Sequence, residues 1–256
     1  MASKQTTGPG HDRIDQDNTA PGPLEMDGLP MPRRIWAICA ISFGTALFVV
    51  DGAIANVALP TIARDLSVSN GAVTSVVTVY QLVMVMVLLP FATIGDRIGH
   101  RRLYQIGQVI FFLASTAALL IDSFWHLIAV RVLQSFGAGI ALSVSAAMLR
   151  TIYPAKSLGS GLGINSVIVA TAYAVAPTLG GFIVEHLDWR WVFVAAAPLA
   201  LISLAIGRFL PEPEPRYGRV DTISGLWSAL TALLLIGGLT LATHDMIVPG
   251  LAAIVA

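Results

Sequence analysis

The eight residues GDRIGHRR, at positions 95–102, lie between two apolar runs that are each long enough to cross a bilayer. Glycine tolerates backbone angles that other residues resist, so Gly95 and Gly99 predict a tight turn here. The charged side chains favour the water interface, and an excess of Lys and Arg is typical of short cytoplasmic loops. The stretch therefore predicts two membrane-spanning helices joined by a short cytoplasmic turn.

The composition extends this prediction to the whole chain. Of its 256 residues, 55% are hydrophobic and 12% are charged. This is about half the charged fraction of a typical soluble domain. The formal net charge of zero gives no indication of nucleic-acid binding, and the single cysteine, Cys39, excludes a disulfide framework within the chain. We expect an all-α, polytopic membrane helix bundle embedded in a lipid bilayer.

The apolar runs define the expected spans. A helix needs about 20 apolar residues to cross the hydrocarbon core. We predict seven spans, at residues 35–59, 73–94, 103–121, 124–149, 162–184, 192–210 and 223–242. A remnant at 247–256 is too short to span and has the pattern of the start of another helix. The chain is therefore expected to be a fragment or a truncated gene product.

The remaining segments complete the domain organisation. Residues 1–34 are polar and rich in Gly and Pro, which predicts a disordered cytoplasmic tail. Residues 35–210 form a six-helix unit. Residues 211–222 form a cytoplasmic linker, because Pro at every second position from 211 to 215 prevents a continuous helix. Residues 223–256 would hold the additional span and the truncated one.

The basic residues of the connections predict the orientation. One side of the membrane would hold most of them, namely Arg33, Arg34, Arg97, Arg101, Arg102, Arg150, Lys156, Arg208, Arg216 and Arg219. The other side holds Arg64 and Arg190, each close to acidic residues. We therefore expect a multi-pass protein of the plasma or inner membrane with a cytoplasmic N-terminus.

Two ionisable residues, Asp51 and Arg131, lie inside predicted spans. A charge at mid-membrane costs about 2.5–3.5 kcal/mol on insertion scales, so such residues are functional-site candidates. At 1.5 Å per residue, Asp51 lies about 12 Å and Arg131 about 10 Å from the outer ends of their spans. The two side chains can therefore pair. In one interpretation, Asp51 exchanges a proton or meets a cationic substrate while Arg131 shifts the proton affinity of the Asp51 carboxylate. In the other, the ion pair only orients two helices.

Other polar and helix-perturbing residues lie in the spans. Six of them are candidates for lining a cavity, although each could equally form a helix–helix hydrogen bond: Asn56, Tyr80, Gln81, Gln134, Asn165 and Tyr173. Pro177, followed by Gly180 and Gly181, is expected to break the fifth span near its outer end. Because Pro removes an internal hydrogen bond, this break would be a hinge or a fixed kink.

The sequence has no pattern of catalytic or cofactor-binding residues. It contains no His/Cys cluster with metal-ligand spacing, no phosphate-binding Gly-rich loop with its Lys and no Ser/His/Asp set outside the spans. We therefore expect neither an enzyme nor a metal or organic cofactor.

Two segments resemble signatures of a known family. Residues 92–103, ATIGDRIGHRRL, resemble the loop signature G-x-L-a-D-R-x-G-R-[KR] of the major facilitator superfamily, with Ala92 and His100 as departures. Residues 51–60, DGAIANVALP, resemble the first-helix signature D-x-T-x-x-N-V-A-L-P of its fourteen-span drug/proton antiporter branch, with Ala53 in place of Thr.

Three further segments extend the resemblance, which covers about residues 35–245. RVLQSFGAG at 131–139 is similar to the fourth-helix motif R-x-x-Q-G-x-G-A, with Ser135 in place of Gly. APTLGG at 176–181 is similar to the fifth-helix antiporter motif G-P-x-x-G-G, with Ala176 in place of Gly. WRWVF at 189–193 is similar to the W-R-W-x-F motif before the sixth helix.

The resemblance implies a fold and a mechanism. The fold would be the six-helix N-terminal half of a major facilitator transporter, and Asp51 and Arg131 would couple transport to the proton gradient. The cytoplasmic gate would comprise Gly95, Asp96, Arg97, Gly99 and Arg101, and the outer hinge Pro177, Gly180 and Gly181. The substrates would be lipophilic cations, dyes or antiseptics, exported by alternating access.

Length limits this expectation. Alternating access rocks one half of such a transporter against the other, so the missing C-terminal half or a second copy would be needed for a complete pathway. Two alternatives remain open. The chain could be a non-transporting regulatory or relic membrane protein, or a facilitator of another small solute.

Overall fold

The computed structural model describes residues 28–212 together with Trp227, Leu230, Thr231 and Leu234. Within residues 28–212 every regular element is helical. The elements are α1 (Met31–Asp65), α2 (Asn70–Ile98), α3 (His100–Ala117), η1 (Ala118–Leu120), α4 (Phe124–Ile152), η2 (Ala155–Ser157), α5 (Leu158–His186), α6 (Trp191–Val194), α7 (Ala197–Ile206) and η3 (Gly207–Phe209).

Within the described residues six helical units are long and apolar enough to cross a membrane, and the third, fifth and sixth of them combine helices. They run over Met31–Asp65, Asn70–Ile98, His100–Leu120, Phe124–Ile152, Ala155–His186 and Trp191–Phe209. The prediction of an all-α polytopic bundle is therefore confirmed. The remnant at 247–256, the linker beyond Glu212, the tail up to residue 27 and all but four residues of the expected seventh span lie outside the described residues.

The helices extend beyond the apolar runs that predicted them. α1 begins at Met31, inside the stretch assigned to the tail, and Pro near its first position has the φ angle that a helix start needs. Side-chain hydrogen bonds also hold this end, from Arg34 Nε to the Leu29 carbonyl (2.8 Å) and from Arg33 Nε to the Phe209 carbonyl (3.1 Å). Hydropathy marks the apolar part of a span, whereas backbone hydrogen bonds continue the helix into the polar interface.

The connection between α2 and α3 is shorter than predicted. α2 continues to Ile98 and α3 begins at His100, so Gly99 alone makes the turn, with φ of +103°. The prediction for Gly99 is confirmed and that for Gly95 is wrong. Gly95 is a buried helical residue, and a Cβ there would lie 2.6 Å from Val144 Cγ1 of α4. Its role is to let two helices approach closely.

The fifth span is not interrupted at the predicted break. α5 is one helix from Leu158 to His186, with Pro177 inside it. Membrane helices tolerate Pro where packing supports the helix, and α5 packs along α1. Gly180 lies at this contact, where a Cβ would be 2.8 Å from Ile54 Cγ1, whereas Gly181 faces open space.

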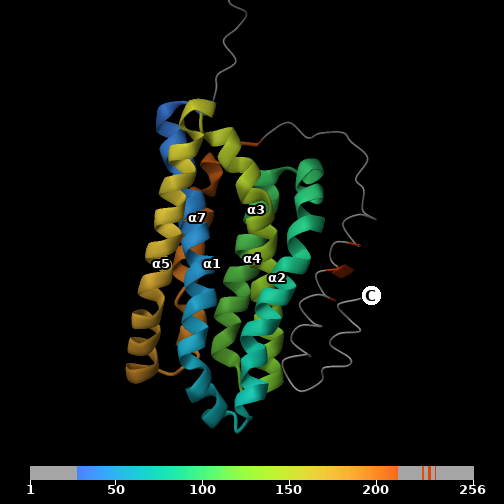
Figure 1. Ribbon diagram of the computed structural model, residues 1–256, viewed down its shortest axis with the longest axis vertical. Helices are drawn as coiled ribbons and strands as arrows, with labels where there is room; N and C mark the ends of the chain where they lie inside the picture. Colours follow the sequence, from blue (N-terminus) through green and yellow to red (C-terminus); the bar gives the residue numbers. More distant parts are fainter. Residues whose placement is uncertain (1–27, 213–226, 228–229, 232–233, 235–256) are drawn as a thin grey trace, which may run out of the picture.

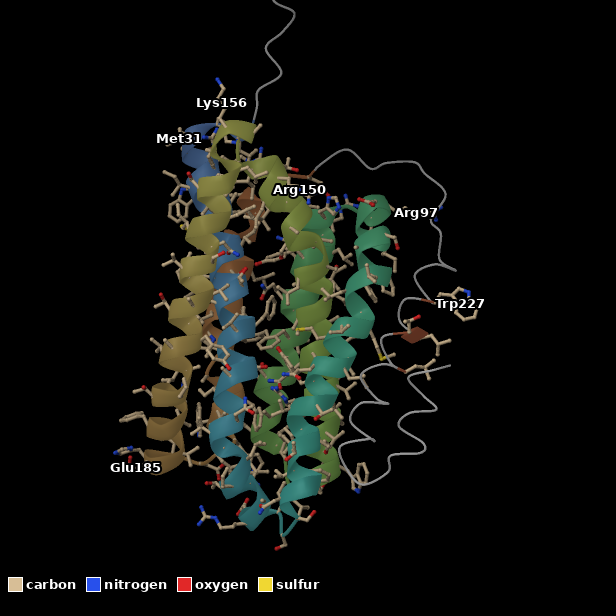
Figure 2. All side chains as sticks on the ribbon, in the orientation of Figure 1. Met31, Arg97, Arg150, Lys156, Glu185 and Trp227 are labelled. Atoms are coloured by element: carbon tan, nitrogen blue, oxygen red, sulfur yellow. The ribbon has the colours of Figure 1, made fainter. Side chains whose placement is uncertain are left out.

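The helices lie side by side along the long axis of the molecule (Figure 1). α4 packs against α2 and α3, and α1 packs against α5 and α7. Met31, Arg97, Arg150 and Lys156 lie at one end of the bundle and Glu185 at the other (Figure 2). The labelled basic residues of the predicted cytoplasmic connections therefore lie at the same end of the bundle.

A buried polar cluster joins α1, α3 and α7, and we call its members Ala40, Tyr104, Gln108 and Ser203 the Tyr104 cluster. Tyr104 Oη and Ser203 Oγ lie 2.9 Å apart, and they lie 3.0 Å and 2.8 Å from the Ala40 carbonyl. Gln108 Nε2 donates to Ser203 Oγ at 3.3 Å. All three side chains are fully buried and neutral. The cluster fixes the third and sixth spans onto the first.

Candidate functional site

The two charges predicted inside the membrane meet. Asp51 lies in the middle of α1 and Arg131 in the first half of α4, and Arg131 Nη1 donates to Asp51 Oδ2 at 2.9 Å. Neither side chain is exposed at all. The estimate of equal depth from helical rise therefore identified a real ion pair.

Gln134 connects this pair to two further spans. It lies three residues after Arg131 on α4, so the two side chains share one face of the helix. Arg131 Nη1 donates to Gln134 Oε1 at 3.0 Å. Gln134 Nε2 in turn donates to Ser115 Oγ at 2.9 Å and to the Phe193 carbonyl at 3.1 Å. Asp51, Ser115, Arg131, Gln134 and Phe193 form what we call the Arg131 cluster.

The Phe193 carbonyl is available because the sixth span is discontinuous. α6 ends at Val194 and α7 begins at Ala197, with Pro198 in its first turn. Pro198 has no N–H for the Val194 carbonyl four residues earlier, and the interruption between α6 and α7 also removes the helical partner of the Phe193 carbonyl. Among the described residues no backbone N–H donates to the Phe193 carbonyl. Gln134 supplies the donor that this carbonyl would otherwise lack.

Two aromatic rings enclose the Arg131 guanidinium. Its Cζ lies 4.0 Å from the ring centroid of Tyr80 on α2 and 5.2 Å from that of Phe193. Both distances are within the range of cation–π attraction, which strengthens when the cation is desolvated. Five of the six spans thus contribute to the surroundings of Arg131.

The pair has hydrogen-bonding capacity that no described residue uses. The atoms concerned are Asp51 Oδ1, Arg131 Nε, Arg131 Nη2 and Tyr80 Oη. Buried charges are strongly coupled to their partners, so removing one of them destabilises a fold by about 3–5 kcal/mol. Proton uptake by Asp51 would weaken the pair and leave these polar atoms to reorganise. The arrangement can therefore link protonation to movement of α1 against α4.

A cavity of about 290 Å³ lies beside the cluster. Its lining is mostly apolar and comes from α1, α2, α4 and α5. Four of the six predicted lining residues border it: Asn56, Tyr80, Gln81 and Tyr173. Gln134 and Asn165 do not, since Gln134 is buried within the Arg131 cluster and Asn165 is half-buried on α5. Asp51 and Arg131 themselves are also absent from the lining.

The predicted gate residues lie at the connection between α2 and α3, away from the ion pair. Asp96 contacts His100, with Oδ1 and Nε2 3.1 Å apart. Arg102 Nε contacts Glu212 Oε1 at 3.2 Å, so this connection is tied to the end of the sixth span. Arg97 lies at the last turn of α2. The structure brings these residues together but does not connect them to Asp51.

The sequence analysis missed Ser115, Phe193 and Pro198. Pro198 was the available signal, because a proline within an apolar span marks an interruption of the helix, and backbone groups near the interruption can be satisfied by a neighbouring polar side chain. Ser115 carried no such signal, since a lone serine in a membrane helix usually bonds to its own backbone.

A bundle of six membrane-length helices with a buried ion pair beside an apolar cavity defines a polytopic membrane transport protein. The chain belongs to the Major Facilitator Superfamily, whose family model matches residues 41–255. Members of this family and the relatives below are transporters, so the chain is a transporter-family protein and not an enzyme.

Three curated relatives are similar in sequence. The Uncharacterized transporter YebQ of Escherichia coli is 44% identical over 85% of this chain and 48% of its own length. The Riboflavin transporter RibZ of Clostridioides difficile is 32% identical, over 72% and 40%. The Puromycin resistance protein pur8 of Streptomyces alboniger is 33% identical, over 74% and 38%. The chain thus spans less than half the length of each.

A solved structure supports the fold. The inward open conformation of the xylose transporter XylE from E. coli superposes with a TM-score of 0.63 over 86% of this chain and 56% of that one, at 18% identity. At this identity the similarity describes the helical arrangement alone.

Proposed function

We propose that these residues form the N-terminal half of a proton-coupled exporter of the fourteen-span drug/proton antiporter branch. Lipophilic or cationic compounds would be its substrates. The observation that carries this proposal is the fully buried Asp51–Arg131 pair, 2.9 Å apart, beside a cavity of about 290 Å³. The resistance function in the name of pur8 supports export of toxic compounds. RibZ is a relative with a different named substrate, so the family alone does not decide this.

The chemistry of the pair supports coupling to protons. A buried ion pair loses most of its attraction when its carboxylate is protonated, and the helices that carry the two partners can then separate. α1 and α4 both line the cavity, so their separation would change its shape. Protonation of Asp51 would in this way change the cavity that holds the substrate, so that proton uptake is coupled to substrate release.

The location of the basic residues supports a cytoplasmic N-terminus in the cell membrane. Arg97, Arg150 and Lys156 share the end of the bundle at which Met31 lies (Figure 2). Positive residues in short connections favour the cytoplasmic side. In this orientation the ion pair lies in the outer half of the bilayer, and the proton gradient would be the energy source.

Everted membrane vesicles carrying the transporter that contains this chain test the proposal. An imposed proton gradient should drive dye accumulation, and Asp51→Asn should abolish it while the protein level is unchanged. Asp65→Asn is a matched control, because Asp65 is a carboxylate at the end of the same helix and its oxygen can still accept from Trp189 Nε1. Accumulation by Asp51→Asn at the original level would refute the coupling role. Uptake independent of the proton gradient would identify a facilitator instead.

A further inference from the structure

We propose that Tyr80 is a movable barrier between the cavity and the Asp51–Arg131 pair. Its ring would control when the Asp51 carboxyl can be reached from the cavity. The consequence for transport rests on the function proposed above, whereas the barrier itself is a property of the bundle that can be measured without transport.

The first argument is position. Tyr80 lines the cavity, and the same ring lies over the Arg131 guanidinium at 4.0 Å. Asp51 and Arg131 lie behind it, with both side chains fully buried and neither bordering the cavity. Tyr80 thus both borders the cavity and contacts the pair, which makes its ring the place for a barrier to a proton that moves from the cavity to Asp51.

The second argument is that the ring is held mainly by its contact with the Arg131 guanidinium. The Tyr80 hydroxyl is buried and interacts with Asp51, but it makes no hydrogen bond of full geometry with any described residue. A buried polar group without a partner favours conformations in which it finds one. The guanidinium would keep an aromatic neighbour after the ring leaves, because Phe193 lies on it from α6 at 5.2 Å. Loss of the Tyr80 contact is therefore partly compensated.

The third argument is space. Gly52 follows Asp51 on α1 and also lines the cavity. A Cβ at Gly52 would lie 3.8 Å from Tyr80 Cε1, and no other atom would be within contact distance. A glycine here leaves room beside the ring on the side of the cavity. Side chains larger than alanine at this position would restrict the movement of the ring.

The position of the ring has a consequence for the unsatisfied atoms of the pair. Asp51 Oδ1 and Arg131 Nη2 have no partner among the described residues. When the ring swings aside, these atoms become open to the cavity. Proton exchange at Asp51 would then be limited by the fraction of time that Tyr80 spends in the open position.

Carbodiimide labelling of Asp51 in the purified chain, reconstituted in lipid vesicles, tests this proposal. The reagent, dicyclohexylcarbodiimide, reacts with protonated carboxyl groups, and mass spectrometry of the peptide containing Asp51 gives the rate. Labelling scales with the accessible fraction, so Tyr80→Ala should raise the rate about tenfold or more. Tyr80→Phe keeps the ring and should stay within about twofold of the original protein, and Gly52→Val should lower the rate.

Val76→Ala is the matched control. Val76 is fully buried one turn before Tyr80 on α2 and does not line the cavity. Its truncation loosens the helix without removing the barrier, so the labelling rate should not change. An unchanged rate in Tyr80→Ala, or an equal rise in Val76→Ala, would overturn the proposal. If Asp51→Asn still accumulates dye while Tyr80→Ala accelerates labelling, the coupling role fails and the barrier stands.

Discussion

The two buried polar clusters of the bundle differ in what they leave unsatisfied. The Tyr104 cluster joins α1, α3 and α7 through neutral side chains, and three hydroxyl and carbonyl oxygens lie within 2.8–3.0 Å of one another. The Arg131 cluster holds two full charges, and three atoms of its Asp51 and Arg131 side chains have no partner among the described residues, whereas the neutral Tyr104 cluster leaves one such atom, Gln108 Oε1. Both are fully buried, so burial alone does not distinguish a structural cluster from a functional one.

The surroundings of the two clusters distinguish a structural cluster from a functional one. The Tyr104 cluster is enclosed by packed helices, and a Cβ at Gly44 would overlap the Tyr104 hydroxyl. The Arg131 cluster lies behind a single ring that borders a cavity. Neutral, close-packed polar contacts hold helices together, whereas charged contacts with spare bonding capacity beside a cavity can exchange partners. We infer that α1, α3 and α7 move as one unit and that change is concentrated around Arg131.

Removal of one charge should have the largest effect on stability. Arg131→Ala leaves Asp51 buried without its partner, which should lower the free energy of unfolding by about 3–5 kcal/mol. The double variant Asp51→Leu/Arg131→Met removes both charges and should recover most of this loss, because apolar replacements of a buried pair are often neutral or stabilising. Denaturant unfolding in detergent, followed by tryptophan fluorescence, measures both. A double variant as unstable as Arg131→Ala would contradict the expectation.

Overpacking of the Tyr104 cluster should have the second largest effect. In Gly44→Ala the added methyl group overlaps the Tyr104 hydroxyl, and such overpacking costs about 1–3 kcal/mol. Adding Tyr104→Phe removes the overlapping hydroxyl, so the two substitutions should compensate each other in part. A double-mutant cycle of unfolding free energies measures this coupling. Strictly additive effects would show that the Tyr104 hydroxyl does not pack against Gly44.

The sequence predicted that Asp51 and Arg131 can pair because the depth of each residue follows from one helical dimension. Distance along a span follows from residue number, so equal depth of Asp51 and Arg131 could be calculated, and the structure places them 2.9 Å apart. Rotation about the helix axis does not follow from residue number. The contact of Gln134 with Ser115, and the absence of Gln134 from the cavity lining, depend on that rotation.

The predictions made from glycine and proline were right at some positions and wrong at others, because each residue type has two structural uses. Gly99 has a positive φ and makes the turn, whereas Gly95 and Gly180 are helical residues at close helix–helix contacts. Composition cannot separate these two uses, because both require the absence of a Cβ. Pro177 lies inside a continuous helix, but Pro198 begins α7 after a break. The outcome depends on whether neighbouring helices support the chain through the lost hydrogen bond.

Single hydroxyl deletions in the two clusters should have the smallest effects and also the most informative ones. Ser203→Ala removes the hydroxyl that bonds to Ala40 and Gln108, at a cost of about 1 kcal/mol. Ser115→Ala should cost less, about 0.5 kcal/mol, since Gln134 Nε2 keeps its bond to the Phe193 carbonyl. If the clusters differ as proposed, Ser203→Ala changes only the unfolding free energy. Ser115→Ala should also change proton-driven dye accumulation in vesicles, because one of the two hydrogen bonds that hold the Gln134 amide beside Arg131 is then lost. An equal effect of both variants on accumulation would remove the distinction between the clusters.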